Sequence, residues 1–225
     1  MNDLASSMKE KYGFEGPCKP DILSKRALPF LTNGKKLLDV GCGEGADSVF
    51  YAKNGFDVLA LDHNNTYLNR LRAYKNDCNL SNLEIRNANV ITYRYPRNHY
   101  DVVSCILVGC CMRRSEFEKM LVSLKKTVKM DGIIVMSLRN YLDLDIIDEF
   151  PPLTKEIEPN TYLNDGDCCT IQYYIEKDRL MSHFKNFEIL YYYEGLVKDK
   201  YKEYPQHGDS YIICRKIENR ARPTV

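Results

Sequence analysis

The chain has 225 residues, of which 44% are hydrophobic and 28% charged, and its formal net charge is +1. This length and composition predict one globular domain and exclude a disordered chain. The near-zero net charge argues against a nucleic-acid partner or an anionic membrane surface. Residues 102–112 are too short an apolar run to span a membrane, and the N-terminus has no apolar signal segment. We therefore expect a cytoplasmic protein.

The nine cysteines predict free thiols rather than a disulfide framework or a zinc site. No CxxC pair occurs, and several cysteines lie in apolar runs, where a reduced thiol behaves as a small hydrophobe. The acidic group of Asp143, Asp145, Asp148 and Glu149 lacks the glycine turn of a calcium loop, so we interpret it as a solvated face. No metal is expected.

The first half of the chain alternates between helical and strand patterns. Residues 1–20 end in a Gly-Pro-Cys-Lys-Pro stretch, which predicts a flexible N-terminal arm or lid ahead of a single domain at residues 21–225. Apolar spacing predicts a helix at 21–31, stopped by the Asn-Gly pair at 33–34. Further on, strands are expected at 36–40, 57–61, 83–87, 101–107 and 132–138, and helices at 46–53, 66–78 and 115–128.

Beyond Arg139 the rhythm loosens into an irregular substrate-side segment at about 139–185. We expect residues 143–159 to form a loop with one short helix, followed by an extra strand at 169–175 and a helix at 178–184. Strands at 187–193 and 210–216 would close the chain. Together these elements predict a Rossmann-like, doubly wound α/β fold with a mostly parallel seven-stranded sheet and an antiparallel last strand.

A glycine turn, Asp-Val-Gly-Cys-Gly-Glu-Gly at 39–45, lies where the first strand becomes a helix. Glycine lets the backbone turn tightly and lets a ligand approach, and the helix N-terminus offers free N–H groups. Asp62 ends the next strand, where a carboxylate accepts ribose hydroxyls. It could also simply cap the helix near Thr66, but the combination favours an adenosine-type cofactor.

The same turn also fits the dinucleotide pattern GxGxx[GA], since Ala46 follows Gly45. Asp39 argues against a dinucleotide, because its carboxylate would repel a pyrophosphate but could help to hold an ammonium group. The two closing strands also predict a hairpin rather than a second nucleotide-binding half. Adenosine with an amino-acid group is therefore favoured over a nicotinamide cofactor.

Residues 37–45 and the pair Leu61-Asp62 resemble the first two motifs of the class I S-adenosylmethionine-dependent methyltransferases. Residues 100–107 and 130–135 resemble the fourth and fifth strands of that family. Residues 46–50 and 192–195 are most similar to its tellurite-resistance-type branch of small-molecule methyltransferases. The resemblance implies that S-adenosylmethionine is the cofactor, S-adenosylhomocysteine the product and a small molecule the acceptor, with no nucleic-acid recognition domain.

The resemblance also implies the cofactor contacts. The family usually carries Asp at the adenine edge; here Asn89 replaces it, and an amide oxygen can still accept from the adenine amino group. The implied cofactor-binding residues are Asp39, Gly41, Cys42, Gly43, Gly45, Asp62, His63, Asn89, Val90, Ile106 and Leu107.

Ligands of a doubly wound sheet gather at the carboxyl ends of its parallel strands. This rule selects Arg113, Arg139 and Tyr141 as substrate-binding residues, with Tyr12 of the arm as part of a lid. The arginines favour an anionic acceptor. His207 is the candidate general base, because histidine titrates near neutrality. The alternative for His207 and Arg113 is a solvated surface position.

Two other functions remain open at this point. A non-catalytic S-adenosylmethionine-binding partner subunit would share the cofactor motifs. Loss of activity in an Arg139 or His207 variant that still binds the cofactor would instead support an enzyme. A nicotinamide-dependent oxidoreductase would bind NAD in preference to S-adenosylmethionine. The sequence leaves the acceptor atom and the oligomeric state undetermined.

Overall fold

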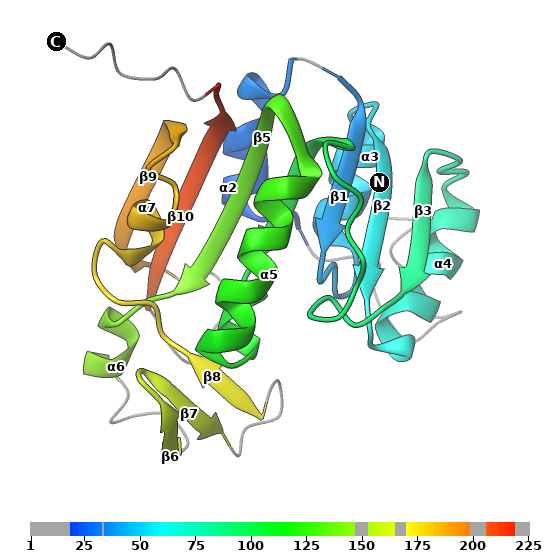
Figure 1. Ribbon diagram of the computed structural model, residues 1–225. Coiled ribbons are helices and arrows are strands. Elements are labelled where there is room, and N and C mark those ends of the chain that lie inside the picture. Colours follow the sequence, from blue (N-terminus) through cyan, green and yellow to red (C-terminus); the bar gives the residue numbers. More distant parts are fainter. Residues whose placement is uncertain (1–18, 33, 147–152, 165–169, 199–205, 219–225) are drawn as a thin grey trace, which may run out of the picture.

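The structure is a computed structural model that describes residues 19–32, 34–146, 153–164, 170–198 and 206–218 (Figure 1). Most of the expected N-terminal arm, Tyr12 included, lies outside these residues. Among the described helices, none is long and apolar enough to cross a membrane.

A seven-stranded sheet forms the centre of the fold, in the order β3-β2-β1-β4-β5-β10-β9 (Figure 1). Parallel pairing joins the first five strands in that order, and β10 runs antiparallel to both β5 and β9. The predicted mostly parallel sheet with an antiparallel last strand is therefore confirmed. Its strands are β1 (Lys36–Val40), β2 (Asp57–Asp62), β3 (Leu83–Asn87), β4 (Tyr100–Ile106), β5 (Val128–Arg139), β9 (Phe187–Val197) and β10 (His207–Lys216).

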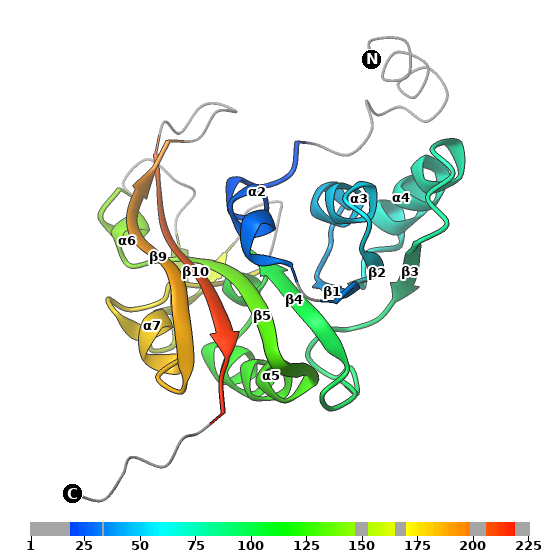
Figure 2. The same cartoon turned by 90° about the horizontal axis from the view of Figure 1, so that it is seen from above.

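Helices cover both faces of this sheet. Seen from above, α2, α3 and α4 lie on one face and α5 and α7 on the other (Figure 2). The α-helices are α2 (Ile22–Ala27), α3 (Ala46–Lys53), α4 (Asn65–Asp77), α5 (Arg114–Thr127), α6 (Leu142–Ile146) and α7 (Arg179–His183), and the short 3-10 helices are η1 (Leu28–Phe30) and η2 (Gly109–Cys111).

Burial on both faces explains the apolar runs of the central parallel strands. In β1, Leu38 and Val40 belong to one hydrophobic cluster and Leu37 to the other, and all three side chains have no exposed surface. Successive side chains of a strand point to opposite faces, so both faces of β1 must be apolar.

One prediction about local structure was correct only in part, and another was wrong. The segment expected to be a helix at 21–31 is helical from Ile22 to Phe30, but it continues as a 3-10 helix after Ala27, because Pro29 has no N–H for the α-helical ladder. The loop expected at 143–159 instead contains a strand, since β6 (Leu153–Glu158), β7 (Thr161–Asn164) and β8 (Ile171–Tyr173) form a separate antiparallel sheet. The charged residues of β6 gave no apolar strand pattern.

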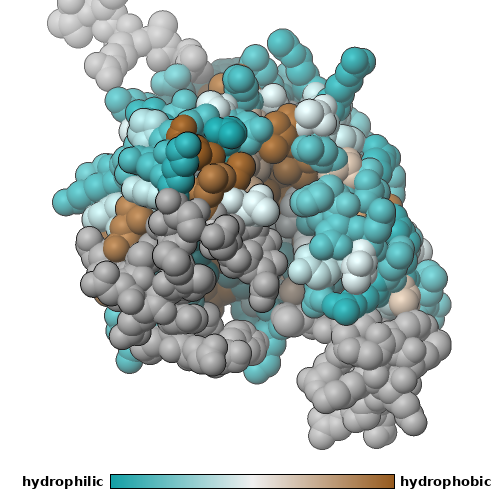
Figure 3. Space-filling model, turned by 90° about the horizontal axis from the view of Figure 1, so that it is seen from below, coloured by the Kyte–Doolittle hydropathy of each residue, from teal (hydrophilic) through white to brown (hydrophobic). Residues whose placement is uncertain are grey.

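The carboxyl ends of the parallel strands lie along one edge of the central sheet, at the bottom of Figure 1. The view from below shows hydrophobic surface on this side, bordered by hydrophilic side chains (Figure 3). The loops that follow β1, β2, β4 and β5 all lie at this edge.

Candidate active site

The glycine turn after β1 contains three left-handed residues, with φ of 67° at Gly41, 53° at Gly43 and 84° at Gly45. A Cβ on Gly41 would lie 2.5 Å from Val108, and one on Gly45 would lie 2.3 Å from Leu71. A Cβ on Gly43 would meet nothing within 4 Å. Gly41 and Gly45 are thus needed for packing, whereas Gly43 borders open space that a ligand can approach.

Asp62, the last residue of β2, is hydrogen-bonded to this turn. Its Oδ2 accepts from the Gly43 N–H at 2.9 Å, and its Oδ1 accepts from the Asn64 N–H at 2.8 Å. A carboxylate offers about four acceptor positions, so these two bonds leave capacity for hydroxyl groups of a ligand. His63 lies beside it, with Nδ1 3.7 Å from Asp62 Oδ1 and its side chain 81% exposed.

Asp39 lies beneath the turn and is only 3% exposed. Its Oδ2 accepts a hydrogen bond from the Ser48 hydroxyl of α3. Burial, assisted by the nearby Asp47, raises the pKa of Asp39 to about 7. Cys42 continues the strand through its N–H, which donates to the Leu61 carbonyl at 2.9 Å, and burial raises the pKa of its thiol.

The other predicted cofactor residues follow β3 and β4 along the same edge. Asn89 is exposed, and its Oδ1 accepts from the Ile91 N–H at 2.9 Å, which leaves one lone pair on the amide oxygen. Val90 is buried in the core, and its carbonyl accepts from the Tyr95 hydroxyl. Ile106 ends β4.

Leu107 follows with a φ of 54°, an uncommon conformation for a branched side chain. Its N–H donates to the Ser137 carbonyl of β5 at 3.1 Å, which holds this conformation in place. Strained residues of this kind occur often at functional sites. Leu107 lies where the cofactor edge meets the neighbouring pocket.

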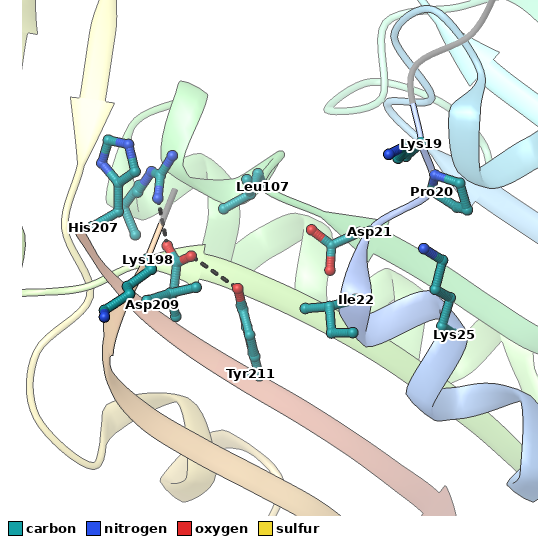
Figure 4. A pocket seen from close by; sticks show the side chains of 12 residues that line it. Lys19, Pro20, Asp21, Ile22, Lys25, Leu107, Lys198, His207, Asp209 and Tyr211 are labelled. Carbon is teal, nitrogen blue, oxygen red and sulfur yellow. Dashed lines mark hydrogen bonds and ion pairs between the residues drawn. The ribbon is translucent and has the colours of Figure 1, made fainter. Parts of the chain in front are cut away.

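That pocket has a volume of about 330 Å³ and lies between α2 and the ends of β4, β5, β9 and β10. Asp21 and Ile22 face Asp209 and Tyr211 across it (Figure 4). The lining residues are Lys19, Pro20, Asp21, Ile22, Lys25, Leu107, Arg139, Val197, Lys198, His207, Asp209 and Tyr211.

Arg139 is held by two buried carboxylates on the floor of the pocket. Its Nη1 lies 2.8 Å from Asp209 Oδ1 and its Nε lies 3.8 Å from Asp143 Oδ2. The Tyr211 hydroxyl donates to the second oxygen of Asp209 at 3.0 Å. Burial raises the pKa of Asp209, although Arg139 acts in the opposite direction.

His207 begins β10 and lies beside the same network, with Nδ1 3.7 Å from Asp143 Oδ1. The same oxygen accepts from the Gly208 N–H at 2.7 Å. Asp143 is 5% exposed, so its interpretation as part of a solvated acidic face was wrong. The charge of Arg139 offsets the cost of burying this carboxylate.

A family model described as Tellurite resistance protein TehB matches residues 10–174. The chain belongs to the TehB family. The match runs from the N-terminal arm through the glycine turn and Asp62 to the small sheet.

Named relatives agree with this assignment. The chain is 27% identical over 103 residues to the "Probable S-adenosyl-L-methionine-dependent methyltransferase TehB" of Haemophilus influenzae. This match covers 43% of this chain and 33% of that protein. It is 36% identical over 74 residues to a "Ubiquinone biosynthesis O-methyltransferase" of Acinetobacter baylyi, covering 32% and 31%. The matches thus span about a third of these relatives.

The fold is similar to the crystal structure of TehB from Haemophilus influenzae. The TM-score is 0.68 at 16% sequence identity, and the alignment covers 94% of this chain and 66% of that chain. At this identity the likeness concerns the fold, which is the Rossmann-like arrangement expected from the sequence.

Within this TehB-family chain, two predicted substrate residues lie away from the pocket. Arg113 precedes α5, and its Nη1 lies 3.8 Å from Glu158 of the small sheet. The Tyr141 N–H donates to the Ile175 carbonyl, and its side chain does not line the described pocket. Of the predicted acceptor-side residues that the structure describes, Arg139 and His207 line it together.

Asp21, Asp209 and Tyr211 are among the pocket residues that escaped the sequence-based predictions. A signal was present for two of them, because residues 207, 209 and 211 alternate along one strand and therefore share a face. Asp21 is the N-cap of α2 and accepts from the Leu23 N–H at 2.7 Å, which is a sufficient structural reason for an aspartate. Asp21 also lines the pocket, and this second role depends on tertiary structure.

Proposed function

We propose that this chain is an S-adenosylmethionine-dependent methyltransferase that acts on a small-molecule acceptor. The observation that carries the proposal is the open space over Gly43, bordered by the Asp62 carboxylate. Membership of the TehB family and the name of the Haemophilus influenzae relative support it. The O-methyltransferase name of the Acinetobacter relative supports a small-molecule acceptor.

The residues present fit this cofactor. The turn at 41–45 would hold its amino-acid part, Asp62 would accept from the ribose hydroxyls, and Asn89 would contact the adenine edge. The buried Asp39 would act through Ser48 on the position of the turn. When bound, S-adenosylmethionine would supply a methyl group on a sulfonium sulfur, and transfer of this methyl group to an acceptor would leave that sulfur as a thioether.

The acceptor would occupy the pocket beside Leu107. His207 would take the proton that the acceptor loses, and Asp143 would orient the imidazole. Arg139 is more than offset by Asp143 and Asp209, and Asp21 adds another negative charge, so the small excess of positive charge comes from three exposed lysines at the pocket. These lysines, Lys19, Lys25 and Lys198, favour an anionic acceptor.

We further propose that the reaction takes place in the cytoplasm. Free thiols suit a reducing compartment. Among the described residues, Cys42, Cys78, Cys105 and Cys214 are free thiols.

A matched pair of glycine substitutions tests the cofactor site. Gly43 and Gly55 both have positive φ, 53° and 87°, and a Cβ on either meets nothing within 4 Å. Gly43→Ala and Gly55→Ala therefore bring backbone strain of the same kind, but only the first places a methyl group in the proposed site.

Calorimetric titration with S-adenosylhomocysteine is expected to show binding to wild type and Gly55→Ala, weakened at least about tenfold in Gly43→Ala. Equal affinities for the two variants would contradict the assignment of the turn.

A further inference from the structure

The proposed cofactor turn and the acceptor pocket are built from different elements. The turn leads into α3, whereas the N-terminus of α2 supplies Asp21, Ile22 and Lys25 to the pocket wall. Methyl transfer requires both sites to be correctly placed at the same time. A connection between α2 and α3 therefore bears directly on the reaction.

Asp47, the second residue of α3, provides that connection. Its Oδ1 accepts from the Asp21 N–H at 2.9 Å, across 26 residues of sequence. Burial raises the pKa of Asp47, and the hydrogen bond from the Asp21 N–H acts in the opposite direction. The start of α2 thus contacts the Asp47 carboxylate through the Asp21 N–H.

Asp47 is in turn fixed relative to the glycine turn. The Val49 N–H donates to the Gly45 carbonyl at 2.9 Å, and the adjacent Ser48 donates to Asp39 at the base of the turn. Elsewhere α2 packs on β5, and the Arg26 guanidinium lies 4.4 Å from the ring centroid of Tyr191 in β9. Asp47 therefore joins α2 to the cofactor side of the molecule.

We propose that Asp47 is a positioning residue that couples occupation of the cofactor turn to the position of α2. This inference rests on the proposed function, because it requires a ligand at the turn. A ligand that holds the turn restricts the start of α3, and the restriction passes through Asp47 to the pocket side chains of α2. Linkage makes the effect reciprocal, so an acceptor bound against α2 would strengthen cofactor binding.

Hydrogen–deuterium exchange of the full chain, with and without saturating S-adenosylhomocysteine, tests this coupling. In wild type the ligand is expected to slow exchange in residues 41–49 and also, about fivefold, in residues 21–27. Asp47→Asn should retain both effects, because the amide oxygen still accepts from Asp21. Asp47→Ala should retain the effect at the turn and lose the effect in α2, whereas the exposed-carboxylate control Asp57→Ala should behave as wild type.

A second pair of variants tests the same hydrogen bond from the other side. Asp21 has a φ of −57°, which proline can adopt. Asp21→Ala and Asp21→Pro both remove the N-cap side chain, but only proline removes the N–H that donates to Asp47. The ligand effect on α2 should persist in Asp21→Ala and disappear in Asp21→Pro, even if Asp47→Ala does not fold.

The outcomes separate the two proposals. Absence of protection at 41–49 in wild type would overturn the proposed function and this inference with it. Protection at 41–49 without protection at 21–27 in wild type would overturn the coupling alone. Equal protection of α2 in Asp47→Ala and Asp47→Asn, or in Asp21→Pro and Asp21→Ala, would also overturn the coupling.

Discussion

Arg139 and Asp209 are register partners on β5 and β10, and their side chains form an ion pair at 2.8 Å on the floor of the pocket. Asp209 has 5% of its side chain exposed and Arg139 has 22%. The pair therefore fixes the antiparallel strand to the parallel sheet at the point where His207 enters the site.

Removal of one partner should be costly for this reason. Asp209→Ala would leave the Arg139 charge partly buried and is expected to lower the free energy of unfolding by about 3 kcal/mol. The control is Glu188→Ala, which breaks the more exposed Arg215–Glu188 pair at 2.9 Å between β9 and β10 and should cost less than about 1 kcal/mol. Urea unfolding measures both, and equal losses would contradict the importance assigned to the floor pair.

Asp39 should make stability depend on pH. Its pKa is raised from 3.8 to about 7, so the folded state holds a proton that the unfolded state has released. Its contribution to the stability of the folded state is therefore present below about pH 4 and is lost as pH rises through 7. Between pH 4 and pH 8, the free energy of unfolding of Asp39→Asn should rise relative to that of wild type by roughly 2–4 kcal/mol. Parallel stability profiles of the two proteins would show that this carboxyl is not buried as described.

Asp62 should matter for the cofactor more than for the fold. Asp62→Ala removes the acceptor for the Gly43 N–H and the proposed acceptor for the ribose hydroxyls, and should weaken S-adenosylhomocysteine binding at least about tenfold. Asp62→Asn retains one oxygen and should lie between the alanine variant and wild type. Calorimetry gives the affinities, and unchanged binding by the alanine variant would remove Asp62 from the site.

His207 distinguishes an enzyme from a non-catalytic binding subunit. His207→Asn is expected to lower methyl transfer from labelled S-adenosylmethionine to small anionic acceptors by about 10²-fold, because the substitution removes the proposed base. Its affinity for S-adenosylhomocysteine should match that of wild type. A variant with full transfer activity would exclude His207 as the base while leaving the cofactor site intact.

The central sheet could be predicted because its signals are local. The central strands β2, β4 and β5 contain near-continuous apolar runs. The breaks are explicit, as at Gly55, which follows α3 with a φ of 87°. The glycine turn and Asp62 could be placed together because they lie at the carboxyl ends of two neighbouring parallel strands, β1 and β2. The small sheet was missed because the charged residues of β6 carry no such pattern.

The acceptor side was harder to predict because its residues are partners only in three dimensions. Nothing local in the sequence pairs Arg139 with Asp209, 70 residues later, or buries Asp143 beneath them. Arg113 could not be separated from Arg139 by position, since both follow parallel strands. Only the tertiary structure directs Arg113 toward Glu158.

The most direct test of the account is calorimetric titration of the wild-type protein with S-adenosylhomocysteine and, separately, with NAD. The proposed cofactor site predicts micromolar binding of S-adenosylhomocysteine and much weaker binding of NAD. No binding of S-adenosylhomocysteine, or tighter binding of NAD, would contradict the assignment of the glycine turn and Asp62 to S-adenosylmethionine.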